Sequence, residues 1–395
     1  PMILLVMFAL VMVLQLIPLP PALWQSFGGP PRFSPALVAP GQPLPWRPLS
    51  VTPDGTWNSL VALLVPATML AGYAALSERQ RRFLLPALLL LVIASAVFGV
   101  AQVASGKYSP LYYYRFMHLG LPDGFFANRN HHAALLATSL PMLRVWTLLP
   151  TRHQGAARSR NALALCVGAL ILLVGLVTGS RSGLAMMLVG LLGAFFVRPQ
   201  LPGARLPVKY RVAIVAAIIL CIVAVVAVAL LNERAIAIDR LMGIDIEEKE
   251  NRIRTLPVLI DVIRQTFPFG TGFGSFVPVY QMYEPDSLLD FSYLNNAHND
   301  LIELTITGGI LALLVLLSLV IWWARASFLA FFRASEFSAD TALRRAAVFG
   351  IAILFLASMT DYPLRTPLMS GVFALFCAWL ADRSGSFHHR HGHSA

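Results

Sequence analysis

The sequence predicts an all-α, polytopic membrane protein, and three observations lead to this prediction. Of its 395 residues, 57% are hydrophobic and 12% are charged, whereas a soluble domain carries about 25% charged residues. The mean hydropathy is +0.70, which excludes a disordered chain because such chains are polar. The apolar residues form continuous runs, whereas the strands of a membrane β-barrel alternate in hydropathy.

Ten apolar runs are predicted to form transmembrane helices, because crossing about 30 Å of hydrocarbon takes roughly 20 helical residues. In chain order they are 2–18, 57–76, 83–104, 130–149, 161–178, 183–197, 212–231, 301–323, 346–360 and 364–382. The first run lacks the basic segment and the A-x-A-like site of a signal peptide, so we interpret it as a helix of the mature protein. Since the chain opens on Pro1 within an apolar context, we expect further residues upstream.

The charges of the connecting loops predict how these helices are oriented. One set of alternate loops holds 16 Lys and Arg but four acids, counting Asp382 at its edge. These loops are 77–82, 151–160, 198–211, 324–345 and 383–395. The positive-inside rule makes them cytoplasmic. The outward-facing loops are then 19–56, 105–129, 179–182, 232–300 and 361–367.

The chain therefore divides into four regions. Seven helices with short loops occupy 1–231, a large outward loop occupies 232–300, and three helices occupy 301–382. The His-rich tail, 383–395, is expected to be a disordered cytoplasmic segment rather than a metal site.

Charge and cysteine content exclude two other classes of function. The net charge of +11 would suggest nucleic acid in a soluble protein. Here the basic residues lie between apolar runs, so we attribute them to membrane topology and expect no nucleic acid partner. Cys166, Cys221 and Cys377 all lie inside apolar runs without metal-ligand spacing, so neither a disulfide framework nor a metal site is expected.

Five arginines on the outward side are exceptions to the charge rule and indicate a ligand. They are Arg129, Arg181, Arg252, Arg254 and Arg365. Arginine binds phosphate oxygens in a forked geometry, so this group suggests a polyanionic substrate. The alternative for each of them alone is that its side chain extends to the lipid headgroups.

The long outward loop contains two recognisable segments. Ile253, Leu256, Ile260 and Ile263 recur at helical spacing and predict an amphipathic helix. The glycine-rich segment 268–274 follows, and it is read as a tight turn that brings backbone close to a ligand, because no strand precedes it as a nucleotide loop requires. Beyond it, Tyr280 is a candidate for stacking on a sugar face, with an interfacial aromatic belt as the alternative.

His298 is the candidate general base, because an imidazole exchanges protons near neutral pH. It precedes the eighth predicted helix, with Asp300 and Glu303 close by in sequence. Asn299 or Asp300 is expected to cap that helix. The alternative for His298 is an interfacial polar group without a chemical role.

Three segments in order resemble the O-antigen ligase and polysaccharide polymerase superfamily. They are 126–131 (Phe-Ala-Asn-Arg-Asn-His), 180–183 (Ser-Arg-Ser-Gly), and 268–274 running on to Ala-His-Asn-Asp at 297–300 with Gly308-Gly309. The resemblance covers roughly residues 85–325. It implies a GT-C-like membrane glycosyltransferase, of a family that usually has about twelve transmembrane helices.

The resemblance also implies a reaction and its partners. Such proteins move a glycan from undecaprenyl diphosphate to an acceptor sugar, on the periplasmic face of the bacterial inner (cytoplasmic) membrane. In ligases the acceptor is lipid A–core, and in polymerases it is a second lipid-linked repeat unit. No nucleotide sugar, metal or other cofactor is expected. The family's catalytic histidine matches His298, its arginine in the Ser-Arg-Ser turn matches Arg181, and its loop arginine matches Arg252, with Arg254 as a competing alignment.

The residues and the resemblance lead to one hypothesis. Arg181 and Arg252 hold the diphosphate, and His298 takes the proton of the acceptor hydroxyl. Asp300 or Glu303 orients the imidazole. The other candidates for substrate binding are Arg129, Arg254, Asn128, Asn130, His131, Arg365 and Tyr280.

Two other classes of function fit the sequence less well. A transporter or channel would need charges within the membrane, and the ten runs hold almost none apart from Arg144. No inverted repeat is visible either. A structural scaffold would leave the outward arginines and His298 without a role.

Overall fold

The computed structural model describes residues 1–26, 42–115, 117–151, 153–197, 246–289, 293–333 and 338–382, with the side chains of 246–253 outside the description. These residues form helices and one isolated bridge between Leu19 and Arg47. The helices are α1 (Met2–Leu16), α2 (Pro21–Ser26), α3 (Pro53–Ala62), α4 (Leu64–Ala75), α5 (Glu78–Arg81), α6 (Leu84–Ala104), α7 (Arg129–Leu148), α8 (Gln154–Val177), α9 (Arg181–Phe196), α12 (Ile246–Thr266), α13 (Phe276–Tyr283), η3 (Asp286–Leu288), α14 (Asp300–Phe332), α15 (Ala339–Thr360), η4 (Pro363–Arg365) and α16 (Pro367–Ala381).

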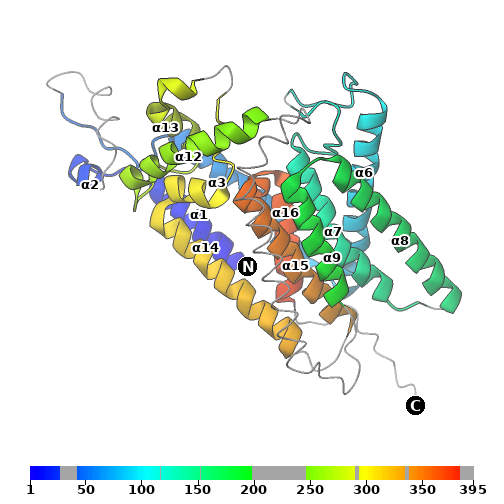
Figure 1. The fold of residues 1–395 in the computed structure, drawn as a ribbon. Helices are drawn as coiled ribbons and strands as arrows, with labels where there is room; N and C mark the ends of the chain where they lie inside the picture. Colours follow the sequence, from blue (N-terminus) through cyan, green and yellow to red (C-terminus); the bar gives the residue numbers. More distant parts are fainter. Residues whose placement is uncertain are drawn as a thin grey trace, which may run out of the picture.

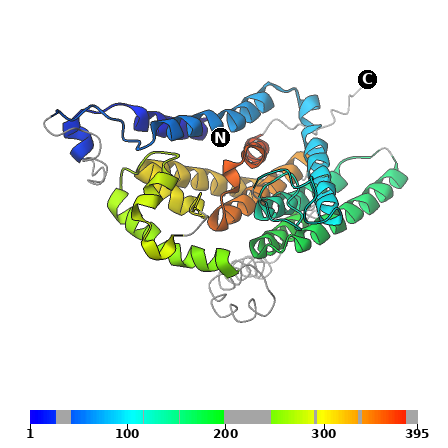
Figure 2. The ribbon, with the colours of Figure 1, turned by 90° about the horizontal axis from the view of Figure 1, so that it is seen from above.

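The long helices stand side by side in a bundle whose upper end in Figure 1 carries α12 and α13. We call this the site end. Viewed from there in Figure 2, the N-terminal helices line one side of the bundle. Contacts run from α4 to α16, from α16 to α15, from α15 to α7 and from α7 to α9.

Helix α7 lies at the centre of the bundle and is buried along nearly its whole length. Its closest neighbour, α9, presents glycines to it. A Cβ atom added at Gly183 would lie 2.6 Å from Ala133 Cβ, and one added at Gly190 would lie 2.5 Å from the Ala137 carbonyl oxygen. Small residues allow helices in membranes to approach this closely. The packing brings the first residues of the two helices, Arg129 and Arg181, to the site end together.

The opposite end of the bundle carries the loops that the charge pattern assigns to the cytoplasmic side. Arg81, after α4, pairs with Asp382, after α16, at 3.1 Å, and Tyr73 donates to the same carboxylate at 2.6 Å. Arg160 at the start of α8 donates to the Thr147 carbonyl at the end of α7. The described helices therefore alternate in direction as the sequence predicts.

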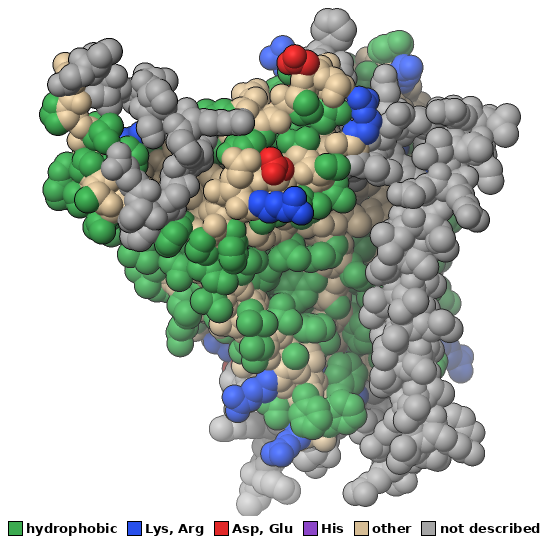
Figure 3. All heavy atoms as spheres, turned by 60° about the vertical axis from the view of Figure 1, so that its left-hand side comes forward, with side chains coloured by type: hydrophobic (Ala, Val, Ile, Leu, Met, Phe, Trp, Pro, Cys, Tyr) green, Lys and Arg blue, Asp and Glu red, His purple; other side chains and the backbone are tan. Residues whose placement is uncertain are grey.

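The side of the bundle in Figure 3 shows a broad apolar band with charged side chains above and below it. Apolar side chains on α8 and α14 are exposed, and Leu165, for example, is 76% exposed. Five helical stretches are long and apolar enough to cross a membrane: Pro53–Ala75, Glu78–Ala104, Gln154–Val177, Asp300–Phe332 and Ala339–Thr360. Three shorter helices, α1, α9 and α16, are also apolar. Together these features fit a multi-pass membrane protein.

Nine of the ten predicted runs coincide with described helices to within a few residues, except that three of these helices extend further at one end. The tenth, 212–231, lies outside the described residues, as does the tail 383–395. The all-α prediction is confirmed for the described part of the chain. The number of about ten transmembrane helices stays a prediction.

The glycine-rich turn 268–274 packs on a kink in α14. Gly309 has a φ of +61°, which interrupts the helix and frees carbonyl groups of the preceding turn. The amides of Thr271 and Gly272 donate to the Ile306 and Thr307 carbonyls at 3.0 and 2.9 Å. The turn therefore satisfies backbone groups that a kinked helix would otherwise leave unpaired. Its close approach is to backbone of this chain, whereas the sequence analysis expected an approach to a ligand.

Candidate active site

A single buried carboxylate organises the site. Asp361 caps the end of α15 and is 1% exposed. Its Oδ2 atom accepts hydrogen bonds from the side-chain amides of Asn128 at 2.9 Å and Asn130 at 2.8 Å. Its Oδ1 atom lies 3.4 Å from His298 Nδ1 and 3.6 Å from His131 Nε2. The three segments that carry these residues are far apart in the sequence and meet at this one group.

The two imidazoles favour the ionised form of Asp361. Burial alone would raise the pKa of its carboxyl group, but the hydrogen bonds and charges of His131 and His298 outweigh burial and hold that pKa well below its usual range. The carboxylate is therefore ionised at neutral pH. It lies within 3.4 Å of His298 Nδ1, where a carboxylate favours one orientation of the imidazole.

The start of α14 sets the position of His298. Asn299 caps this helix by accepting bonds from the amides of Leu301 and Ile302. Its side-chain amide donates to the Met359 carbonyl at 3.0 Å, which ties the loop to the end of α15. His298, just before the cap, has a φ of +50°. Few residues other than glycine adopt this left-handed conformation, and strained backbone is concentrated at functional sites.

Tyr362 completes this wall of the site. Its ring centroid lies 5.3 Å from that of His298 and 5.2 Å from that of His131. The Asn295 side chain donates to the Tyr362 hydroxyl at 3.3 Å. The imidazole of His298 is therefore held by a carboxylate on one side and by an aromatic ring on another.

The two acids expected to orient His298 are instead paired with Arg365. Its Nε atom lies 3.0 Å from Asp300 Oδ1, and its Nη1 atom lies 2.8 Å from Glu303 Oε1. The other oxygen of Glu303 accepts from the Ala297 amide at 2.9 Å. These contacts bind Ala297 and Arg365 to the start of α14. The carboxylate that lies beside His298 Nδ1 is Asp361.

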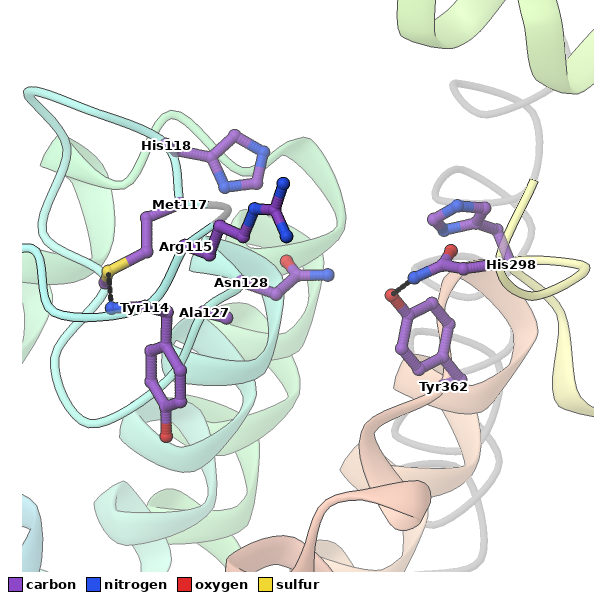
Figure 4. A pocket seen from close by; sticks show the side chains of 9 residues that line it. Tyr114, Arg115, Met117, His118, Ala127, Asn128, His298 and Tyr362 are labelled. Carbon is purple, nitrogen blue, oxygen red and sulfur yellow. Dashed lines mark hydrogen bonds between the residues drawn. The ribbon is translucent and has the colours of Figure 1, made fainter. Parts of the chain in front are cut away.

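A cavity of about 580 Å³ opens beside His298. It is lined by Tyr114, Arg115, Met117, His118, Ala127, Asn128, Asn295, His298 and Tyr362. Figure 4 shows two walls, one from the segment 114–128 and one that carries His298 and Tyr362. Asn128 points from the first wall toward the second, where its amide reaches Asp361.

Arg129 and Arg181 lie near one another at the site end. Arg129 is the first residue of α7, and its Nη1 atom lies 3.9 Å from the place where a Cβ atom on Gly179 would be. Gly179 and Ser180 lead directly into Arg181, the first residue of α9, and Ser180 caps that helix by accepting from the Gly183 amide at 2.9 Å. Arg129 lies between Asn128 and Asn130, whose side chains bind Asp361, and Arg181 begins the helix that packs against α7.

Arg129 and Arg181 are not among the residues that line the cavity, and neither are two further candidates, Arg254 and Tyr280. Arg254 donates to the Ser287 carbonyl at 2.8 Å, which joins α12 to η3. Tyr280 is 2% exposed and stacks on Phe276 with 5.9 Å between ring centroids, within the apolar cluster beneath α12. The Arg252 side chain lies outside the described part of the chain.

The structure brings four residues to the site that were not predicted from the sequence: Asp361, Tyr362, Arg115 and His118. The signal for Asp361 was an acid at the end of an apolar run, in a loop predicted to face outward with Arg365. Arg115 and His118 lie in another loop predicted to face outward. Within the described ranges, no group of three or more His, Cys, Asp or Glu residues could hold a metal ion.

Comparison with known proteins finds a family match in the middle part of the chain. A family model described as O-Antigen ligase matches residues 166–317. The match includes Arg181, Arg252 and His298, and it confirms the resemblance to this superfamily over two of the three sequence segments; the first segment, 126–131, lies outside it. A search of curated proteins found no match.

Proposed function

We propose that the protein is a glycosyltransferase whose active site is the cavity beside His298, and the O-Antigen ligase family model that matches residues 166–317 supports this. The donor is a glycan linked to undecaprenyl diphosphate, and the acceptor is a sugar hydroxyl of lipid A–core. The observation that carries the proposal is the contact between His298 and the buried Asp361 at the edge of this cavity.

His298 acts as the general base. With its Nδ1–H donated to the Asp361 carboxylate, its Nε2 atom has a lone pair for the proton of the acceptor hydroxyl. The acceptor oxygen then forms a bond to the anomeric carbon of the donor sugar. The bond from that carbon to the diphosphate oxygen breaks, so the anomeric configuration is inverted and the proton remains on His298.

The arginines stabilise the leaving group. The negative charge on the diphosphate grows as the glycosidic bond breaks, and fixed guanidinium groups stabilise such charge more in the transition state than in the ground state. Arg181 and Arg129, near one another at the site end, are suited to this role, and Arg252 is the third candidate. A diphosphate leaves as an anion without taking a proton, so this mechanism needs no acid on that side, and the guanidinium groups supply the positive charge that a metal ion would otherwise provide.

The arrangement also supports a location. The site end carries the loops that the charge rule assigns to the outward side of the membrane. We therefore place the site on the periplasmic face of the bacterial inner membrane. The lipid-linked donor would diffuse within the membrane and reach the site along the apolar band.

The test is transfer activity in proteoliposomes that contain an undecaprenyl-diphosphate glycan and purified lipid A–core, without nucleotide and with a metal chelator. Wild-type protein is expected to attach the glycan to lipid A–core, as detected by mass spectrometry. His298→Ala, with an unchanged melting temperature, is expected to lose about 10²- to 10⁴-fold of the rate. Full activity in this variant would contradict the assignment of the base. A longer lipid-linked chain as the product would instead show a polymerase that uses the same chemistry.

A further inference from the structure

The wall opposite His298 carries a cation that neither the motifs nor the family match include. The described residues that line the cavity include one arginine, Arg115, and His118 lies beside it. Figure 4 shows the side chains of both residues extending from the segment 114–128 into the space that faces His298 and Tyr362. The family match begins only at residue 166.

The segment that carries Arg115 is fixed in place. The His118 amide donates to Asp123 Oδ2 at 3.0 Å, and the Asp123 side chain is fully buried. The Tyr114 hydroxyl donates to the Phe125 carbonyl at 3.3 Å. Further on, Gly124 bonds to the side chain of Gln102 on α6. The guanidinium of Arg115 is thus presented by a wall that is attached to the bundle.

The chemistry of inversion predicts what lies opposite a general base. The acceptor oxygen, the anomeric carbon and the leaving oxygen lie roughly in line in the transition state. The base is on the acceptor side of this line, so the leaving group must lie on the far side. In this cavity the far side from His298 is the wall that carries Arg115.

We propose that Arg115 binds phosphate oxygens of the donor's diphosphate, on the leaving-group side of the cavity. This rests on the proposed function, since it is the transfer reaction that assigns opposite walls to the base and the leaving group. A guanidinium meets two phosphate oxygens with two parallel hydrogen bonds. His118 lies beside it, with its Nδ1 atom 3.9 Å from Asp123 Oδ1, so it adds a second positive charge to the same wall when protonated.

The test measures diphosphate binding and transfer separately in the full-length protein. Farnesyl diphosphate is the binding probe, and farnesyl monophosphate is the comparison. In Arg115→Ala, the dissociation constant for the diphosphate is expected to rise at least about 10-fold, and the transfer rate to fall by about 10²-fold. Arg115→Lys keeps the positive charge but loses the two parallel hydrogen bonds of the guanidinium. Its dissociation constant and transfer rate are expected to lie between those of wild-type protein and Arg115→Ala. Lys107→Ala is the matched control, because Lys107 lies in the same loop over Tyr108 and does not line the cavity.

Each outcome decides the role of Arg115. Unchanged diphosphate binding and transfer in Arg115→Ala would overturn the proposal and leave the proposed function intact. A raised KM for the acceptor with unchanged diphosphate binding would overturn it too, because Arg115 would then hold the acceptor. If wild-type protein transfers no glycan but Arg115→Ala still binds farnesyl diphosphate more weakly, the proposed function fails and the diphosphate site stands. If Arg115→Ala does not fold, Arg115→Lys decides by the same two measurements.

Discussion

His298 Nδ1 and Asp361 Oδ1 lie 3.4 Å apart, at the point where the chain enters α14 and leaves α15. The same carboxylate is bound by two amides from the start of α7 and lies near a second imidazole, that of His131. The position of the proposed base therefore depends on three helix ends at once. A change at Asp361 is expected to act on His298 and on the cavity wall together.

Replacing Asp361 with asparagine keeps the size of the side chain and removes its charge. We expect transfer to fall by on the order of 10²- to 10⁴-fold, because an amide no longer stabilises the imidazolium that forms on His298. The measurement is the initial rate of glycan transfer in proteoliposomes. Asp382→Asn is the control, since Asp382 pairs with Arg81 at the opposite end of the bundle. Equal losses in the two variants would point to a general effect on folding and contradict the special role of Asp361.

Replacing Arg365 with alanine is expected to reduce stability. Glu303 is nearly fully buried and would lose its ion pair at 2.8 Å, and Asp300 would lose one at 3.0 Å. An unsatisfied buried polar group costs about 1–3 kcal/mol, and a charged one more. Thermal unfolding in detergent measures the loss. Arg254→Ala removes an exposed arginine that bonds to one carbonyl, and it should cost less than about 1 kcal/mol.

The acid Asp123 is expected to make stability depend on pH. Burial raises the pKa of its carboxyl group to about 7, against smaller opposing effects of the His118 amide and Arg129. Between about pH 4 and pH 7 the folded state then binds this proton more tightly than the unfolded state does. Its contribution to stability falls as the pH rises through that window, by at most about 1.4 kcal/mol per pH unit.

Asp123→Asn removes this titration. Denaturant unfolding from pH 4 to pH 7 should show a shallower decline in stability for the variant than for wild-type protein. The asparagine side-chain oxygen can still accept the bond from the His118 amide. Identical slopes for the two proteins would rule out the perturbed carboxyl group.

Gly190 tests the close packing of α7 and α9. A Cβ atom at Gly190 would lie 2.5 Å from the Ala137 carbonyl oxygen, so Gly190→Ala must push the helices apart. We expect a loss of about 1–3 kcal/mol, together with lower transfer, because α9 positions Arg181. Gly72→Ala on α4 is the matched control, since no atom lies within 4 Å of its added Cβ. Its melting temperature should stay the same or rise, because alanine favours a helix.

Hydropathy and loop charge predicted most of the fold. The described helices match nine predicted runs and alternate between the two ends as the arginine and lysine distribution requires. The kink at Gly309 was not predicted, because nothing in a Gly-Gly pair indicates which backbone groups will be freed or what will pair with them. The turn 268–274 supplies those partners in the folded chain.

The candidate site was predicted less completely. Proximity in sequence favoured Asp300 and Glu303 as partners of His298, but the start of a helix directs neighbouring side chains to different sides. Asp300 and Glu303 therefore reach Arg365, while His298, with its φ of +50°, lies against Asp361. Tyr280 has a residue type that suits sugars, and only its packing on Phe276 shows that it is buried.

The amino-acid sequence by itself determined that this chain is a bundle of apolar helices, with His298 and Arg181 at the same end of it. Both results rest on hydropathy and charge, which can be read locally along the chain. The tertiary structure alone decided that Asp361 orients the histidine and that Arg115 faces it across a cavity. These pairings join segments distant in sequence, and their geometry depends on how the helix ends pack against one another.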